Sequence, residues 1–500
     1  MRALISVYDK NGLADFARVL AELGVEIVAS GGTAAFLQEH GIECRPVEEL
    51  TDVPELLGGR VKTLHPRIHA GILARRDRDD DLAALAEHEI EPFDLVVVNL
   101  YPFHREPGVE LIDIGGPAML RGAAKNFEHV AAVCSPDDYP DVLSELRATR
   151  AISAPTRARL AAKAFAHTSA YDAAVTAWLE GEEQLRGRLV LVLEKELDLA
   201  YGENPHQQAA YFRLESAAQH LLSRVEQLHG RDLSFINLYD LAAARTLLAE
   251  LGEEPTCVIV KHANPCGVAV AETIERAYEL AYAGDPLSAF GMVIVLNRPV
   301  PLELGDSLAE RFIDVLYAPS YDDGALDALR RKPATRILAG PALEPDAALD
   351  LKRVPGGFLA QQPDRNLERR GDMEVACGTL DDEQWRELEF AWTVCKHVTS
   401  NAIVIAKGRR AIGIGAGQQS RVDAVRLAVE KAREHGHDLD GAVLASDAFF
   451  PFPDGPQLAL DAGVRAVVQP GGSKRDAEVT AAVEAAGAAM VLTHHRHFRH

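Results

Sequence analysis

Short apolar runs alternate with amphipathic stretches along this chain. Residues 3–7 and 26–29 have the β-branched, apolar character of buried strands, and Leu13 and Leu20 between them recur at helical spacing. Strand-like and helical patterns continue to alternate into the last residues. The pattern predicts an α/β fold for both halves of the chain.

One apolar run, Val258-Ile259-Val260, leads directly into Lys261 and His262. We expect a buried strand that ends at this pair, followed by a turn over Asn264-Pro265-Cys266-Gly267. Ligands of open α/β sheets bind beyond the carboxyl ends of strands. Imidazole titrates near neutral pH, and desolvation lowers the pKa of a lysine. The pair is therefore a candidate acid/base couple, and a surface lysine beside a packed histidine is the alternative.

Small and polar residues also follow the predicted strands of the first half. Ser30-Gly31-Gly32-Thr33 joins a strand to a helix, where backbone N–H groups either cradle a phosphate or form an ordinary tight turn. Residues 57–66 are rich in hydrogen-bond donors, and the strand over 94–100 runs into Asn99 and Tyr101. These segments are candidates for a binding site at one edge of the sheet.

A further helix is expected from about Gly115 to Lys125, directly after Asp113. An aspartate at a helix N-terminus is more often a cap or dipole partner than a catalyst. Asp113 and Lys125 lie near opposite ends of this segment.

The middle of the chain suggests where its parts join. An alanine-rich helix is expected over 155–179, and the charged stretch 181–187 is the candidate linker. The portions 200–365 and 366–500 each contain a Lys-His pair, at 261–262 and 396–397, that we expect to follow a strand. This correspondence suggests an old duplication.

Composition excludes several classes of protein. The chain has 47% hydrophobic and 25% charged residues, which is typical of a globular protein, and it has no apolar run of the ~18 residues that span a bilayer. The six cysteines include no Cys-x-x-Cys pair, and the net charge of −23 argues against nucleic-acid binding. No signal peptide is evident, so we expect a cytoplasmic protein.

Two motifs invite a cofactor or metal hypothesis. Gly413-x-Gly415-x-Gly417 lacks the dinucleotide-binding spacing and follows a hairpin-like turn over 407–410, so a glycine-lined approach to another planar ligand is favoured over NAD. The histidine-rich tail 494–500 lacks a carboxylate or cysteine at ligand spacing. A tail folded back into a site through its arginines is favoured there over zinc.

Several runs occur in an order that matches one family. They are Ser30-Gly31-Gly32-Thr33, Gly59-Arg60-Val61-Lys62-Thr63-Leu64-His65-Pro66, Asn99-Leu100-Tyr101-Pro102-Phe103, Ile112-Asp113-Ile114-Gly115-Gly116, Tyr201-Gly202-Glu203-Asn204-Pro205-His206-Gln207, Lys261-His262 with Asn264-Pro265-Cys266-Gly267, residues 413–421 and residues 446–452. The sequence resembles the bifunctional purine-biosynthesis proteins, which join an N-terminal IMP cyclohydrolase to a C-terminal AICAR formyltransferase. The runs span nearly the whole chain, and each one alone is only moderately specific.

The resemblance implies an α/β fold in several parts. It implies a methylglyoxal-synthase-like α/β/α domain over residues 1–150 and a helical bridge and linker over 151–198. Two cytidine-deaminase-like α/β subdomains of the formyltransferase would follow over 199–365 and 366–500, without the zinc of true deaminases.

The resemblance also implies formyl transfer from the co-substrate 10-formyltetrahydrofolate to the amine of AICAR. His262 would be the base, Lys261 would support the oxyanion and protonate the leaving nitrogen, and Asn401 would help hold the intermediate. Positions that contact AICAR are matched by Tyr201, Ile236, Asn237, Asp314, Arg421 and, for its phosphate, Arg496. Positions of the folate pocket are matched by Phe290, Gly291, Pro451, Phe452 and Asp454.

The N-terminal part would then close the ring of formyl-AICAR with loss of water, giving IMP. The family's catalytic positions are matched by Lys62, Thr63, Tyr101, Asp113 and Lys125. Its other substrate contacts, several of them on the phosphate side, are matched by Ser6, Lys10, Ser30, Gly31, Thr33, Arg60 and Asn99.

Two positions depart from the family. Tyr8 replaces a small serine near the phosphate, and Ala200 replaces an arginine that helps bind the AICAR phosphate. We expect the chemistry to be retained with a raised KM for AICAR, unless Arg213, Arg496 or another cation substitutes.

The resemblance further implies a homodimer, small-molecule substrates, no nucleic-acid or membrane partner and no catalytic metal, and it leaves open a monovalent-cation requirement. Three alternatives stand beside it: a protein with one of the two activities, a nucleotide-sensing module, and a zinc deaminase that the ligand inventory disfavours.

Overall fold

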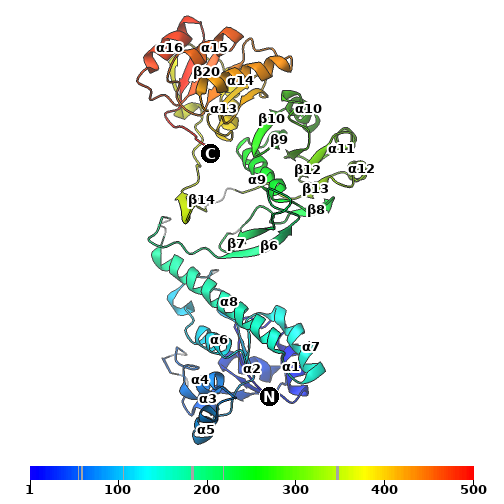
Figure 1. The fold of residues 1–500 in the computed structure, drawn as a ribbon, viewed down its shortest axis with the longest axis vertical. Helices are drawn as coiled ribbons and strands as arrows, with labels where there is room; N and C mark the ends of the chain where they lie inside the picture. Colours follow the sequence, from blue (N-terminus) through cyan, green and yellow to red (C-terminus); the bar gives the residue numbers. More distant parts are fainter. Residues whose placement is uncertain (55, 58–59, 105, 182–184, 218, 345–347) are drawn as a thin grey trace. The chain divides into compact units, whose positions relative to one another are not determined.

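The computed structural model describes the chain except for residues 55, 58–59, 105, 182–184, 218 and 345–347. Gly58-Gly59 and the centre of the predicted linker over 181–187 therefore lie outside the described residues. The chain forms two compact units, Met1–Val192 and Leu193–His500 (Figure 1). The division falls within the predicted bridge over 151–198, and the finer domain boundaries remain predictions.

The first unit is built on a parallel sheet of five strands in the order β3-β2-β1-β4-β5. Its strands are β1 (Arg2–Ser6), β2 (Glu26–Ala29), β3 (Arg45–Pro46), β4 (Leu95–Val98) and β5 (Ala131–Val133). Its helices are α1 (Leu13–Glu22), α2 (Gly31–Glu39), α3 (Val47–Thr51), α4 (Pro66–Leu73), α5 (Asp79–Glu87), α6 (Gly115–Lys125), α7 (Tyr139–Thr149) and α8 (Ala154–Glu180). The predicted α/β alternation is confirmed here.

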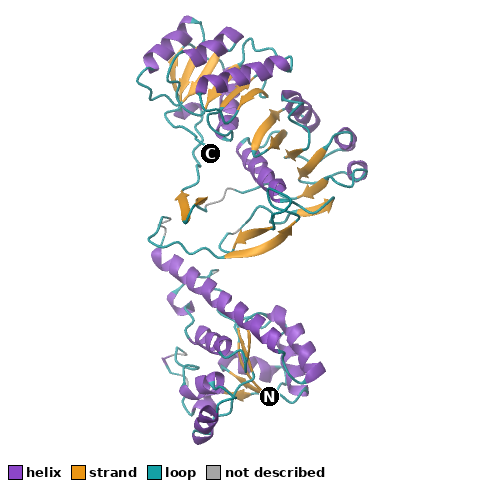
Figure 2. Cartoon of the chain, viewed as in Figure 1, coloured by secondary structure: helices purple, strands orange, loops and turns teal. Residues whose placement is uncertain are grey.

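Helices cover both faces of this sheet (Figure 2). Side chains of α1, α2 and α7, such as Phe16, Leu37 and Val142, share one core cluster with alternate strand residues. Side chains of α4 and α6, such as Ile72 and Leu120, share the other cluster. Strands buried on both faces account for the continuous apolar runs of the sequence.

Helix α8 corresponds to the predicted alanine-rich helix. Ser153 caps its N-terminus by accepting a hydrogen bond from the Thr156 N–H at 3.3 Å. The buried face of α8, including Ala164 and Tyr171, packs on α6 and β5. Among the described residues, no helix is long and apolar enough to cross a membrane.

The second unit contains two six-stranded sheets with the same topology. Their orders are β10-β9-β11-β12-β13-β8 and β18-β17-β19-β20-β21-β16, and corresponding neighbours have the same parallel or antiparallel relation. The first sheet has β8 (Glu226–His229), β9 (Thr256–Lys261), β10 (Asn264–Val270), β11 (Met292–Leu296), β12 (Ile313–Ala318) and β13 (Arg336–Ala339). The second has β16 (Glu374–Cys377), β17 (Ile403–Ala406), β18 (Ala411–Gly415), β19 (Val443–Ser446), β20 (Ala466–Gln469) and β21 (Ala489–Leu492).

Helices occupy the same places in both repeats. The first repeat has α9 (Phe235–Glu250), α10 (Ile274–Gly284), α11 (Leu302–Ala309) and α12 (Asp323–Leu329), and the second has α13 (Asp382–Lys396), α14 (Arg421–Glu434), α15 (Asp454–Ala462) and α16 (Asp476–Ala485). One core cluster joins the two sheets through α9 and α13, with Leu241 and Trp392 fully buried. The shared topology supports the predicted duplication.

Two shorter hairpins complete the second unit. They are β6 (Leu193–Leu199) with β7 (Ala209–Leu214) and β14 (Asp350–Val354) with β15 (Gly357–Gln361).

The expected correspondence between the two Lys-His pairs is wrong. Lys396 and His397 lie at the C-terminus of α13 and not after a strand, and both side chains bind the Glu250 carboxylate at 2.8 Å. The residues that correspond to Lys261-His262 are Lys407-Gly408. Lys261-His262 leads from β9 into the β9–β10 turn, and Lys407-Gly408 leads from β17 into the matching β17–β18 turn. Residues 382–396 have helical periodicity and form α13, so the two Lys-His dipeptides do not occupy equivalent positions in the fold.

The predicted turn over 264–267 is also wrong, because these residues begin β10. The chain reverses two residues earlier, at His262 and Ala263, whose φ angles are 52° and 57°. Two successive residues with positive φ are typical of a tight type I′ hairpin turn, which usually uses Asn and Gly. The turn therefore presents the Lys-His pair itself.

Candidate functional sites

A cavity of about 610 Å³ opens beyond the carboxyl ends of β1, β2 and β4 in the first unit. Its lining comes from the loops after these strands, from the segment between α3 and α4, and from the start of α6. Ten of the predicted residues line it: Ser6, Lys10, Ser30, Thr33, Arg60, Lys62, Thr63, Asn99, Tyr101 and Asp113. Parallel strands bring these distant segments together at one edge.

Polar contacts hold the strand ends of this cavity in place. The Ser30 hydroxyl donates to the Ser6 hydroxyl at 2.6 Å, and the side-chain Oδ1 of Asn99 accepts from the Tyr8 N–H at 2.6 Å and the Asp9 N–H at 3.0 Å. The Tyr8 ring lies edge-on to Tyr101, with 5.4 Å between the ring centroids. Tyr8, which departs from the family, thus forms part of the cavity wall.

Glycines allow the charged groups of the cavity to approach the backbone. A Cβ atom at Gly31 would lie 1.9 Å from Lys62 Nζ, so the ammonium group rests against the turn after β2. A Cβ atom at Gly115 would lie 2.5 Å from Thr63 Oγ1, and one at Gly116 would lie 2.3 Å from Asp113 Oδ2. The predicted small-residue segments therefore serve close packing around Lys62 and Asp113.

Asp113 is both a helix-terminal acceptor and a buried acid. Its carboxylate accepts the Gly116 N–H at 2.8 Å, and burial raises its pKa above the ordinary value of 3.8, although hydrogen bonds from Gly116 and Gly115 oppose the shift. The hydroxyl of Tyr171 on α8 accepts the Asp113 N–H at 2.8 Å. Sequence patterns did not point to Tyr171, because it lies 58 residues away.

Lys125 is not brought to this cavity. It lies in the last turn of α6, whereas Asp113 precedes the first turn, and eleven residues separate the ends of the helix by about 15 Å. Lys125 instead lines a groove with Arg121 and Phe165.

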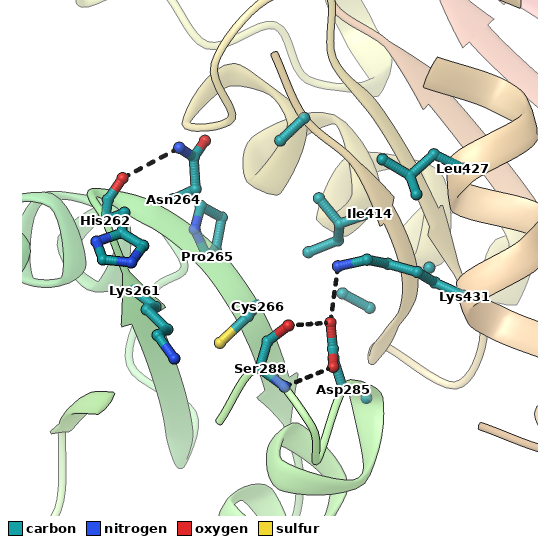
Figure 3. A pocket seen from close by; sticks show the side chains of 14 residues that line it. Lys261, His262, Asn264, Pro265, Cys266, Asp285, Ser288, Ile414, Leu427 and Lys431 are labelled. Atoms are coloured by element: carbon teal, nitrogen blue, oxygen red, sulfur yellow. Dashed lines mark hydrogen bonds and ion pairs between the residues drawn. The ribbon is translucent and has the colours of Figure 1, made fainter. Parts of the chain in front are cut away.

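A second pocket, of about 210 Å³, lies between the two repeats of the second unit (Figure 3). Lys261, His262 and Cys266 line it from the β9–β10 hairpin, and Gly413 and Lys431 line it from the second repeat. Within this pocket, an ion pair of 2.8 Å joins Lys431 to Asp285 across the repeats (Figure 3). Sequence reasoning missed this pair, since nothing local connects α10 with α14.

The hairpin is fixed on both sides of its turn. Lys261 Nζ donates to the Phe290 carbonyl at 2.9 Å. Asn264 donates to the His262 carbonyl at 3.2 Å and accepts the Thr399 N–H at 2.9 Å, which ties the hairpin to the second repeat. His262 is exposed, so its imidazole is accessible to a substrate.

Asn401 and Arg421 form a polar cluster of their own. Arg421 is buried, pairs with Asp447 at 2.5 Å and donates to the side-chain Oδ1 of Asn401 at 2.6 Å. Asn401 also donates to the Gln418 carbonyl at 2.8 Å. The cluster orients the Asn401 amide rigidly.

The remaining predicted residues of the second unit do not line the 210 Å³ pocket. They are Tyr201, Ile236, Asn237, Asp314, Arg421, Arg496, Phe290, Gly291, Asn401, Pro451, Phe452 and Asp454. Phe290 and Phe452 are 66% and 50% exposed, and Asn237 closes a capping box with Ser234 at the start of α9. Burial raises the pKa of Asp314, opposed by the charges of Arg336 and Lys261.

The two cations considered as substitutes for the arginine missing at position 200 have other contacts. Arg213 forms ion pairs with Glu194 and, at 3.3 Å, with Glu196 on the neighbouring strand. The Arg496 guanidinium is exposed and stacks on Phe498, 4.5 Å from the ring centroid.

The two motifs that suggested a cofactor or a metal, residues 413–417 and the tail 494–500, have structural explanations. The turn over 407–410 is confirmed as the β17–β18 hairpin, and Cβ atoms at Gly413 and Gly415 would lie 2.2 and 2.0 Å from carbonyl oxygens of α14. These two glycines therefore allow the strand to pack closely on the helix. In the tail, His497 is buried between Asp364 at 2.6 Å and Glu368 at 2.9 Å. No cluster that could hold a metal ion occurs in the part of the chain that the structure describes.

Comparisons with known proteins identify the family of the chain. The family model for the AICARFT/IMPCHase bienzyme matches residues 123–431, and that for the MGS-like domain matches residues 12–115. Proteins called "Bifunctional purine biosynthesis protein PurH" from Myxococcus xanthus and Chloroflexus aurantiacus are 48% and 49% identical to this chain, over 100% of it and 100% and 99% of their own lengths. A solved structure titled "Crystal structure of ForH" is 43% identical over 35% of this chain and 95% of its own, with a TM-score of 0.34.

The first family model covers more than half of the chain, and the relatives align over its full length. The chain therefore belongs to the AICARFT/IMPCHase bienzyme family and is a bifunctional enzyme of purine biosynthesis that combines AICAR formyltransferase with IMP cyclohydrolase.

Proposed function

We propose that the β9–β10 hairpin carries the formyl transfer and that the cavity of the first unit carries the ring closure. The observation that most strongly supports the first assignment is the conformation of His262. It has φ 52° at a position where the second repeat has Gly408, with φ 63°. A left-handed conformation costs a residue with a side chain about 1–2 kcal/mol, so a histidine there indicates a need for the imidazole.

Formyl transfer from 10-formyltetrahydrofolate needs a base at the AICAR amine and an acid at N10 of the folate. The amine nitrogen attacks the formyl carbon, the bond from that carbon to N10 breaks, and the proton lost by the amine balances the one gained by N10. His262 takes the amine proton, and Lys261 stabilises the oxyanion and protonates N10. Asn401, whose amide is held by Arg421, helps to hold the intermediate.

Ring closure needs cations and donors but no covalent nucleophile. The carboxamide nitrogen of formyl-AICAR attacks the formyl carbon, and water leaves. Lys62 and Thr63 face the developing oxyanion, while Asp113 exchanges protons with the reacting nitrogen or the leaving water. The close packing of Lys62 and Thr63 against glycines, and the raised pKa of Asp113, support these roles.

The finer expectations from the family resemblance also remain proposals. They are cytidine-deaminase-like subdomains, a cytoplasmic homodimer, a possible monovalent-cation requirement, and roles for the residues that lie outside the two pockets. A homodimer would give Lys125, Phe290, Phe452 and Arg496 access to a site formed with a second chain.

One assay tests both assignments. The enzyme is given AICAR and 10-formyltetrahydrofolate, and tetrahydrofolate and IMP are followed separately. Lys261→Ala and His262→Ala should abolish tetrahydrofolate release and leave cyclisation of supplied formyl-AICAR intact. Lys62→Ala should give the reverse pattern.

The alternatives give different outcomes. Release of tetrahydrofolate with accumulating formyl-AICAR would identify a formyltransferase alone, and cyclisation without tetrahydrofolate release would identify a cyclohydrolase alone. Nucleotide binding without either product would identify a sensing module. Simultaneous loss of both steps in Lys261→Ala would refute the two-site assignment.

A further inference from the structure

Asp240, in the second turn of α9, contacts the turn that presents the Lys-His pair. Its carboxylate accepts the Ala263 N–H at 2.6 Å, and the neighbouring His262 N–H lies close enough to lower the pKa of this carboxylate. Only 6% of Asp240 is exposed to solvent. Both N–H groups belong to the two residues with positive φ, so the Asp240 carboxylate binds one backbone donor of the turn and faces the other.

The second repeat contains the same arrangement without the Lys-His chemistry. Asp240 is the sixth residue of α9, and Glu387 is the sixth residue of α13. Glu387 accepts the Gly408 N–H at 2.5 Å, in a turn whose φ angles are 63° and 53° at Gly408 and Arg409. A buried carboxylate under the β-hairpin is thus a shared structural device of both repeats.

A small displacement of the turn would move a candidate catalytic side chain in the first repeat but not in the second. In the second repeat the turn carries Gly408, which has no side chain to aim. In the first repeat the turn carries His262, directly after Lys261, at the edge of the 210 Å³ pocket. Displacement of a reacting group by about 1 Å can cost about 100-fold in rate, so rigidity matters here and not in the second repeat.

We propose that Asp240 is a positioning residue for formyl transfer, which fixes the His262–Ala263 turn through its hydrogen bond to the Ala263 N–H and so aims Lys261 and His262 at the substrates. The proposal rests on the assignment of formyl transfer to this hairpin. Asp240 acts through the backbone and does not itself touch the reacting atoms.

Three variants of the full-length enzyme separate positioning from folding. Asp240→Leu removes the acceptors with little change in volume, Asp240→Asn keeps one acceptor oxygen in place, and Glu387→Leu removes the equivalent carboxylate of the second repeat. For each variant, kcat and KM of formyl transfer, cyclisation of supplied formyl-AICAR and the melting temperature are measured.

We expect Asp240→Leu to lower kcat for formyl transfer about 10- to 100-fold with KM changed less than about 3-fold. Asp240→Asn should recover most of this loss, since the amide oxygen accepts the same Ala263 N–H. Glu387→Leu should lower the melting temperature as much as Asp240→Leu does and retain kcat. Cyclisation should be unchanged in all three.

The proposal is overturned if Glu387→Leu loses as much kcat as Asp240→Leu, or if Asp240→Asn is no better than Asp240→Leu. If the Asp240→Leu protein does not fold, the Asp240→Asn variant decides alone. It must retain kcat to within about 5-fold, and a larger loss overturns the proposal. An inactive wild type, or an active Lys261→Ala variant, would instead refute the assignment of the hairpin. Full activity of Asp240→Leu beside an inactive Lys261→Ala would refute the positioning role alone.

Discussion

Replacing His262 by glycine should make the second unit no less stable while abolishing formyl transfer. His262 has φ 52°, a conformation that costs a residue with a Cβ about 1–2 kcal/mol relative to glycine. A glycine also lowers the free energy of unfolding by about 0.5–1 kcal/mol, because it gives the unfolded chain more conformational freedom. Because the His262 side chain is exposed, little packing is lost. The free energy of unfolding should therefore rise by about 0–1.5 kcal/mol.

The second repeat supplies the matched control. A Cβ atom at Gly408, where φ is 63°, would meet no heavy atom of the described residues within 4 Å, apart from its own chain neighbours. Gly408→Ala therefore isolates the backbone cost and should lower the free energy of unfolding by about 1 kcal/mol while formyl transfer is retained. Stability is measured by urea denaturation with protein concentration fixed, and activity by tetrahydrofolate release.

Loss of general-base assistance by His262 should reduce kcat by about 10²- to 10⁴-fold. The reasoning is refuted if His262→Gly destabilises the protein as much as Gly408→Ala does, since the turn would then hold no strain. It is also refuted if His262→Gly keeps its rate, since the imidazole would then have no catalytic role.

Three further substitutions test the sites. Burial raises the pKa of Asp113, so its ionisation destabilises the fold as pH rises from 3.8 through that raised pKa. The Asp113→Asn variant should therefore have a higher melting temperature than the wild type at neutral pH, and it should cyclise formyl-AICAR more slowly. Both quantities can be measured on one preparation. Gly116→Ala places a Cβ 2.3 Å from Asp113 Oδ2 and 2.8 Å from Leu100, so it should lower stability by about 1–3 kcal/mol and cyclisation with it, while unchanged cyclisation would contradict the proposed role of Asp113. Ala200→Arg restores a charge next to Tyr201 and should lower the KM for AICAR about 10-fold in steady-state assays, whereas an unchanged KM would show that the phosphate lies elsewhere.

Local sequence patterns were sufficient for the strands of the first unit and for most of the first cavity. The apolar runs at 3–7, 26–29 and 94–100 form strands buried on both faces, and their polar ends had to meet because parallel strands share a carboxyl edge. The resemblance to a family whose motifs recur in order identified the same segments. For this reason most residues predicted for the first site were found together.

Only the tertiary structure could decide the contacts between repeats and the roles that depend on them. Lys396-His397 resembles Lys261-His262 in the sequence, yet the structural equivalent of Lys261-His262 is Lys407-Gly408, because strand pairing and not dipeptide identity sets the register. Asp240 lies 23 residues before the turn that it supports, and no local pattern distinguishes it from a surface aspartate on a helix. Sequence periodicity reports which face of an element is buried, whereas hydrogen bonds between distant elements depend on how those faces pack.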